Sequence, residues 1–249
     1  MIDHIGLEVC VDSPAGLLAA VKAGADRIEL CSSLALSGLT PAPGLMALAA
    51  RQAKPSYAMI RAHPGPFRYS RQDLDVMRGD IDAAREAGLP GVVIGANRAD
   101  GTLDEDLLRA LADHAAGLAM TLHRAFDLAP DFEQALETAI DLGFERILTS
   151  GGARTAILGA ERIAGFVVQA GDRISIMAGC GVGPGNVAEL VRRTGVREVH
   201  GSFGAPVAFA GEDPVARARA VELGFVHPGL RDTDPAAVAE VVEILARHA

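Results

Sequence analysis

The sequence predicts an α/β fold, a single (β/α)₈ TIM barrel that occupies residues 1–249 as one domain. The length of 249 residues suits one barrel, and no run rich in Pro, Ser and Gly divides the chain. A unit of helix, glycine and apolar strand recurs along the sequence. Together with the strand candidates between these units it gives eight strands, and eight strands close a barrel.

The recurring unit ends an amphipathic helix at a glycine, and a strand rich in Val, Ile and Leu follows. Glycine adopts the left-handed backbone at low cost, which suits a helix end. Four units begin at Gly24, Gly88, Gly143 and Gly195 and cover residues 24–30, 88–94, 143–149 and 195–200. Further strands are expected at residues 6–11, 57–61, 118–123 and 173–178. Helices between strands imply parallel pairing. A doubly wound open sheet is the alternative, and it would need an open edge.

Helix signals fall where this strand count needs them. Serine or aspartate followed by proline is typical of a helix start, and serine three residues before an acidic residue indicates a capping box. These signals are Ser13-Pro14, Asp234-Pro235, and Ser70 with Asp73. Apolar residues recur at helical intervals over residues 74–84, 132–140 and 238–245.

Composition narrows the function classes. The net charge of −9 without a Lys/Arg cluster disfavours nucleic acid and anionic membrane surfaces as partners. No apolar segment reaches the length of a membrane span, and the amino terminus lacks a basic stretch followed by an apolar run, so a cytoplasmic location is expected. The three cysteines form no CxxC pair, which favours free thiols. Small molecules, ions and other protein chains remain as partners.

Charged and imidazole side chains gather at the predicted carboxyl ends of the strands. Active sites of this fold lie at that mouth, so these residues are candidates for acid-base catalysis. They are Glu8, Glu29, His123, Asp127 and His200. A glutamate inside a barrel needs a cation or donors, and Arg61 and Arg124 are the expected partners. On the alternative interpretation Glu8, Glu29 and Glu198 only form buried ion pairs that fill the barrel.

Two arginines and two glycine-rich loops are candidates for binding a small anion. Glycines let backbone amides approach an anion, and barrels commonly bind phosphate at their last loops. The candidates are Arg61, Arg124, Ser150, Gly151, Gly152, Gly179 and Gly181. Tight turns alone would also explain this much glycine.

Cys10 and Cys31 are candidate metal ligands. Each lies two residues after a glutamate on the first and second strands, and neighbouring strands run about 4.8 Å apart. Paired sulfur ligands suit Cu(I) better than Mg²⁺ or Ca²⁺. Two small buried apolar residues are the alternative interpretation, because free cysteine is often buried. Cys180, between two glycines, is a weaker candidate.

Several segments of the chain resemble the copper homeostasis protein CutC family, and together they extend over nearly the whole chain. The matching segments are Leu-Glu-Val-Cys (7–10), Gly-Ala-Asp-Arg-Ile-Glu-Leu-Cys (24–31), Gly-Leu-Thr-Pro (38–41), Phe-Arg-Tyr-Ser (67–70), His-Arg-Ala-Phe-Asp (123–127), Arg-Ile-Leu-Thr-Ser-Gly (146–151), Met-Ala-Gly (177–179) and Glu-Val-His (198–200). The resemblance implies a cytoplasmic (β/α)₈ homo-oligomer, a dimer or tetramer, that handles copper with Cu(I) on cysteine. Cys10 and Cys31 occupy the matching positions.

The chain departs from the family pattern in two loops. The loop after the third strand keeps Arg61 but loses the family's second arginine and its aspartate, and Cys180 replaces a glycine. Two functions therefore remain open. The first is Cu(I) binding in copper homeostasis. The second is an enzyme that acts on a small anionic, including a phosphorylated, substrate with Glu and His as acid-base groups.

Overall fold

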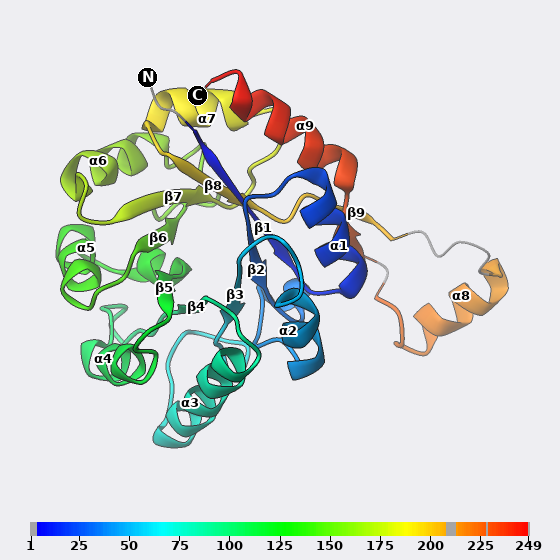
Figure 1. Ribbon diagram of the computed structural model, residues 1–249, viewed down its shortest axis with the longest axis horizontal. Helices are drawn as coiled ribbons and strands as arrows, with labels where there is room; N and C mark the ends of the chain where they lie inside the picture. Colours follow the sequence, from blue (N-terminus) through cyan, green and yellow to red (C-terminus); the bar gives the residue numbers. More distant parts are fainter. Residues whose placement is uncertain (1–3, 208–212, 228, 249) are drawn as a thin grey trace.

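The computed structural model describes residues 4–207, 213–227 and 229–248, and a closed parallel barrel forms its centre (Figure 1). Each strand pairs in parallel with the next along the chain, and β8 pairs with β1. The barrel strands are β1 (Gly6–Val11), β2 (Arg27–Leu30), β3 (Ser56–Met59), β4 (Gly91–Ile94), β5 (Ala119–Leu122), β6 (Arg146–Thr149), β7 (Ser175–Gly179) and β8 (Glu198–Gly201). The predicted (β/α)₈ fold is confirmed, and its eight strands form a closed barrel.

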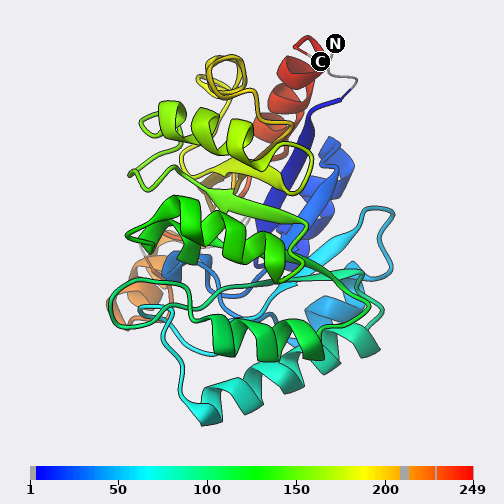
Figure 2. The ribbon, with the colours of Figure 1, turned by 90° about the vertical axis from the view of Figure 1, so that its left-hand side faces the viewer.

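Helices surround the barrel, and Figure 2 shows α3 to α7 following one another along the outside of the strands. The helices are α1 (Pro14–Ala23), α2 (Pro43–Ala49), α3 (Arg71–Glu86), α4 (Glu105–His114), α5 (Phe132–Asp141), α6 (Ala160–Ala170), α7 (Val187–Thr194), α8 (Pro214–Glu222) and α9 (Pro235–Ala246), with short 3₁₀ turns η1 (Leu34–Leu36) and η2 (Arg124–Leu128). The predicted caps of α1, α3 and α9 are all present. In the described part of the chain, no helix is long and apolar enough to cross a membrane.

Successive side chains along each barrel strand point alternately toward the surrounding helices and into the barrel. On β1, Leu7 and Val9 belong to the large apolar core that also includes residues of the surrounding helices. Glu8 and Cys10 alternate with them and therefore point into the barrel. The apolar cluster inside the barrel is small, with Cys31, Tyr57, Met59 and Val93 as its buried members. Much of the barrel interior is thus left to charged and polar side chains.

An excursion between β8 and α9 was not anticipated from the sequence. Strands β9 (Gly204–Pro206) and β10 (Arg231–Thr233) form an antiparallel pair, and α8 projects away from the barrel beyond them (Figure 1). Helix α8 has no buried residue, so it takes no part in the core. The helix that completes the ring is α9, whose Val238, Val241 and Leu245 are buried.

Candidate functional site

A cavity of about 530 Å³ opens at the carboxyl ends of the strands. Its lining includes many of the residues predicted from the sequence, namely Cys10, Glu29, Arg61, His123, Arg124, Asp127, Gly181 and His200. The lining does not include Glu8, Cys31, Ser150, Gly151, Gly152 or Gly179. Because this is the end of the barrel where the fold carries its active sites, this cavity, the mouth cavity, is the candidate site.

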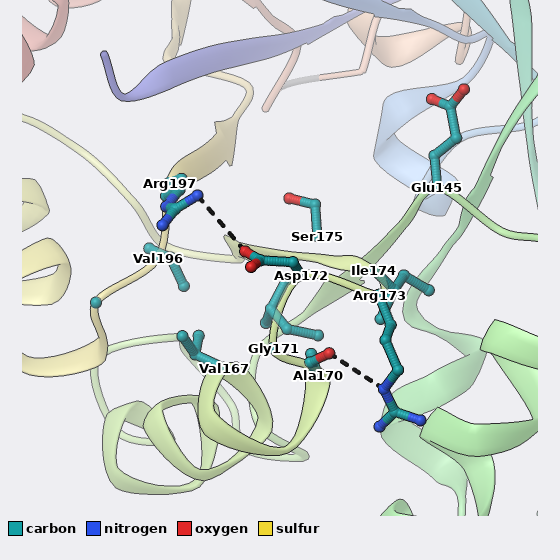
Figure 3. A pocket seen from close by; sticks show the side chains of 12 residues that line it. Glu145, Val167, Ala170, Gly171, Asp172, Arg173, Ile174, Ser175, Val196 and Arg197 are labelled. Carbon is teal, nitrogen blue, oxygen red and sulfur yellow. Dashed lines mark hydrogen bonds and ion pairs between the residues drawn. The ribbon is translucent and has the colours of Figure 1, made fainter. Parts of the chain in front are cut away.

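A larger hollow of about 630 Å³ lies at the opposite end of the barrel (Figure 3). Its lining includes Glu145, Ile174 and Val196, which precede β6, β7 and β8. Arg197 lies 4.0 Å from Asp172 at its rim, and both side chains are largely exposed. Residues at this end of a TIM barrel serve stability rather than chemistry, so size does not make this hollow the site.

The glutamates inside the barrel have other partners than the predicted Arg61 and Arg124. Arg27 forms ion pairs with Glu8 and, at 2.8 Å, with Glu198. Arg146 lies 3.0 Å from Glu198. The pairing prediction was wrong because it depends on strand register, which places Arg27 directly opposite Glu8. Although burial opposes ionisation, the charge of Arg27 and a hydrogen bond with His200 lower the pKa of Glu8 to about 2.

Register also brings Cys10, Glu29 and His200 together. Cys10 is opposite Glu29 across the β1–β2 pair, and His200 is opposite Glu8 across the β1–β8 pair. One ligand atom from each of Cys10, Glu29 and His200 lies within 4.8 Å of the other two, and all three residues are buried. Because these three residues could hold a metal ion, they are called the metal-binding cluster below.

His200 is held from behind by a carboxylate. Its Nδ1 lies 2.8 Å from Glu8, while its Nε2 faces Glu29 at 3.8 Å. A histidine whose second nitrogen is hydrogen-bonded to a carboxylate has the orientation found at metal sites. Burial acts against protonation, but Cys10 and Glu29 raise the pKa of His200 well above its usual value.

Cys31 lies beside this cluster rather than within it. The Cys31 amide donates to Val11, so Cys31 continues β2 one residue beyond the register pairs. Its thiol donates to Glu29 at 3.5 Å. Burial raises the pKa of both thiols, and the carboxylate of Glu29 raises that of Cys31 further. Glu29 therefore contacts Cys31 and also lies in the cluster with Cys10.

His123 caps the 3₁₀ turn η2. The Ala125 amide donates to His123 Nδ1 at 3.0 Å, so Nδ1 is an acceptor and the neutral ring carries its proton on Nε2. That Nε2 is buried and makes no hydrogen bond to any described residue. Burial, and then the charge of Arg61, lower the pKa of His123 to about 3. The imidazole is therefore neutral near neutral pH.

Arg61 is a buried cation, and its exposed fraction is 4%. Its Nη1 donates to the carbonyls of Leu36 and Gly38, both at 2.8 Å, and its Nη2 donates to Gly65 at 3.1 Å. Its Nε is buried and makes no hydrogen bond to any described residue. These carbonyls orient the guanidinium without neutralising its charge.

Asp127 occupies the glycine loop after β6. Its carboxylate accepts from Thr149 Oγ1 and from the amides of Ser150 and Gly152, and it lies 2.7 Å from Arg124. Two of the amides that were predicted to bind an external anion thus already donate to an internal carboxylate. A catalytic role of Asp127 and anion binding by this loop stay predictions.

Gly179 makes room for Leu148 and His200, and replacing it should disturb their packing. A Cβ at this position would lie 2.5 Å from Leu148 Cδ1 and 3.2 Å from His200 Cβ. We expect Gly179→Ala to lower the free energy of unfolding by about 2 kcal/mol, because overpacking moves neighbouring side chains. Urea unfolding measures this change. Gly183→Ala is the control, since a Cβ there meets nothing within 4 Å, and equal stability of the two variants would contradict the prediction.

Two residues of the site were missed in the sequence. Arg27 shares its strand face with Glu29, so alternation alone could have identified it as an inward-facing cation. Phe67 lies over both buried donors of the mouth cavity, with its ring centroid 5.0 Å from Arg61 Cζ and 4.5 Å from the His123 ring centroid. Phe67 begins the Phe-Arg-Tyr-Ser segment that resembles the family, but its place beside these donors depends on the path of the loop after β3.

The CutC family model matches residues 5–205. A family protein CutC from Caulobacter vibrioides is 63% identical over 96% of each chain, and one from Rhizobium meliloti is 54% identical over 95% of this chain and 94% of the relative. A crystal structure of CutC from Streptococcus agalactiae, named for copper homeostasis, superposes with a TM-score of 0.77 at 32% identity and covers 80% of this chain and 98% of that one.

Proposed function

This chain belongs to the CutC family, and from that membership we propose that it acts in copper homeostasis and binds Cu(I) at the mouth of the barrel. The observation that carries the proposal is the metal-binding cluster of Cys10, Glu29 and His200 within 4.8 Å. The resemblance to the family suggests cysteine as the ligand. The cluster adds an imidazole that the sequence did not pair with Cys10.

The donor set fits copper in its reduced state. Thiolate is a soft ligand that selects Cu(I), and imidazole also suits copper. Cys10 and His200 would hold the ion, and Cys31 would supply the second thiol from beside Glu29. Glu29 Oε1 is buried without a hydrogen-bond partner among the described residues, so the cluster has an unused acceptor. Glu8 would orient His200 through its Nδ1.

The same features bear on the cellular location and the oligomeric state of the protein. We propose a cytoplasmic protein, because a reducing compartment keeps Cys10 and Cys31 as the free thiols that Cu(I) needs. We also propose a homo-oligomer, in line with the family resemblance. Exposed apolar side chains around α8, among them Val215, Leu223 and Phe225, would gain from cover by a second copy.

Titration of reduced protein with Cu(I) against a strong competing chelator tests the copper site. We expect Cys10→Ser to weaken binding about a hundredfold and His200→Asn about tenfold, since a ligand lost from a small set is not replaced by water at equal strength. Cys31→Ser should also weaken binding. X-ray absorption of the loaded protein should show both sulfur and nitrogen ligands.

Cys180 provides the matched control for these cysteine variants. The Cys180 thiol lines the mouth cavity but donates to the carbonyl of Arg154 at 3.2 Å. Cys180→Ser should therefore bind Cu(I) like the wild type. Binding that survives loss of Cys10 and Cys31 together, or that depends on Cys180, would rule out this site.

A further inference from the structure

Two buried hydrogen-bond donors in the mouth cavity have no acceptor among the described residues. Neither donor belongs to the metal-binding cluster. They are Arg61 Nε–H and His123 Nε2–H, on side chains that are 4% and 3% exposed. A buried polar group without a partner costs free energy, so native structures rarely keep one without a reason. Both residues line the mouth cavity, which suggests that the missing acceptor belongs to a ligand.

The tautomer of His123 makes its Nε2 a donor only. Because the Ala125 amide donates to Nδ1, the proton of the neutral ring must be on Nε2. A neutral N–H donor suits an uncharged ligand oxygen, such as a ketone or a hydroxyl group. Gly95 helps to maintain this arrangement, because a Cβ at Gly95 would overlap the His123 ring.

Arg61 contributes a charge that the described chain does not balance. No carboxylate of the described residues lies within ion-pair distance of its guanidinium, and its Nη groups donate to main-chain carbonyls. A buried cation held in this way is stabilised when an anion reaches it. The carbonyls fix the guanidinium and leave its Nε–H without a hydrogen bond to a described residue, while the buried hydroxyl of Tyr69 lies beside the guanidinium.

Phe67 contacts both residues that carry the two donors. Its ring lies over the guanidinium of Arg61 and against the imidazole of His123, so one aromatic ring borders both side chains that carry the donors. The Phe67 side chain is itself only partly buried and lies in the loop after β3. A ligand would displace the Phe67 ring from part of its present position. The displaced ring would then cover the ligand.

The number of hydrogen-bond donors that are not already used favours a carboxylate over a phosphate as the ligand. A phosphate group presents three oxygens and needs several donors, but amides of the glycine loop after β6 already donate to Asp127. Arg61 and His123 offer one charged and one neutral donor, which match a carboxylate and an adjacent uncharged oxygen. We propose that Arg61 and His123 form a binding site for a small oxo- or hydroxycarboxylate, with the carboxylate on Arg61 and the neighbouring oxygen on His123.

Calorimetric titration with pyruvate, acetate and inorganic phosphate tests this site. Pyruvate carries both groups, acetate carries only the carboxylate, and phosphate carries neither. We expect pyruvate to bind at least tenfold more tightly than acetate, and phosphate not to bind. No heat from pyruvate in either the wild type or Phe67→Ala, in which the covering ring is gone, would overturn the proposal. Tighter binding of phosphate than of pyruvate would overturn the carboxylate assignment.

A pair of variants at His123 isolates the proposed donor. Asn at this position can accept from the Ala125 amide like Nδ1 but places no donor where Nε2 lies, whereas Gln can carry an amide donor toward that point. We expect His123→Asn to weaken pyruvate binding at least tenfold, to the level of acetate, and His123→Gln to retain most of it. Equal affinity of wild type and His123→Asn for pyruvate would contradict the role of Nε2–H.

The carboxylate site does not depend on the copper proposal, and the same titration can show this. Neither Arg61 nor His123 belongs to the metal-binding cluster. Pyruvate should therefore bind equally to wild type and to Cys10→Ser, both in the presence of a copper chelator. Loss of Cu(I) binding with intact pyruvate binding would reject copper alone, and the reverse result would reject only the carboxylate site.

Discussion

Replacing Arg27 with Met is expected to lower the free energy of unfolding by about 3 to 5 kcal/mol, because it removes the cation from a buried network. Arg27 pairs with Glu8, which is 1% exposed, and with Glu198. Glu198 keeps Arg146 and Ser175 as partners, but among the described residues Glu8 keeps only His200. The cost therefore arises mainly at Glu8, as a carboxylate left inside the barrel without its main counterion. Chemical denaturation monitored by circular dichroism measures it.

The same substitution at a surface pair provides the comparison. Arg173 lies 2.6 Å from Glu137, but both side chains are about half exposed. Surface pairs contribute little, so Arg173→Met should leave the unfolding midpoint almost unchanged. The double variant Arg27→Met with Glu8→Leu should recover part of the lost stability, because removing both charges costs less than stranding one. Equal stability of Arg27→Met and Arg173→Met would show that the interior network is not a stabilising ion cluster.

The barrel itself could be predicted because its signals are local. A glycine at a helix end and a short apolar strand after it depend only on neighbouring residues, and Gly24 and Gly195 indeed end α1 and α7 with positive φ. The excursion with α8 could not be predicted in this way. Asp213 and Pro214 do begin a helix, but α8 has no apolar stripe that would assign it to the core.

The site could be predicted only in part, because its contacts depend on register across strands. The inward direction of Glu8, Glu29 and His200 follows from alternation along each strand. Which of them meet does not: Cys10 lies opposite Glu29, whereas Cys31 lies beyond the paired residues of β2. The sequence therefore favoured a pair of cysteines, and the structure places a glutamate and a histidine next to Cys10.

Lowering the pH from 7.5 to 4 should cost about 3 kcal/mol of stability through His123 alone. In the unfolded chain a histidine has its ordinary pKa of 6.5, whereas burial and the charge of Arg61 lower the pKa of His123 to about 3 in the folded protein. Between these two values the unfolded state binds one more proton than the folded state. Stability contributed by the neutral ring is thus complete above pH 6.5 and is lost progressively as the pH falls toward 3.

A variant that cannot titrate separates this effect from the carboxylates that also protonate in acid. His123→Asn retains an acceptor for the Ala125 amide but has no imidazole. The free energy of unfolding of wild type and variant, measured at pH 7.5, 6, 5 and 4, should converge as the pH falls, by about 1.4 kcal/mol per pH unit below pH 6. Parallel pH profiles would mean that His123 titrates in the folded protein as it does in the unfolded chain. Below about pH 6.5 its Nε2–H would then belong to a cation and not to the neutral donor that the carboxylate site requires.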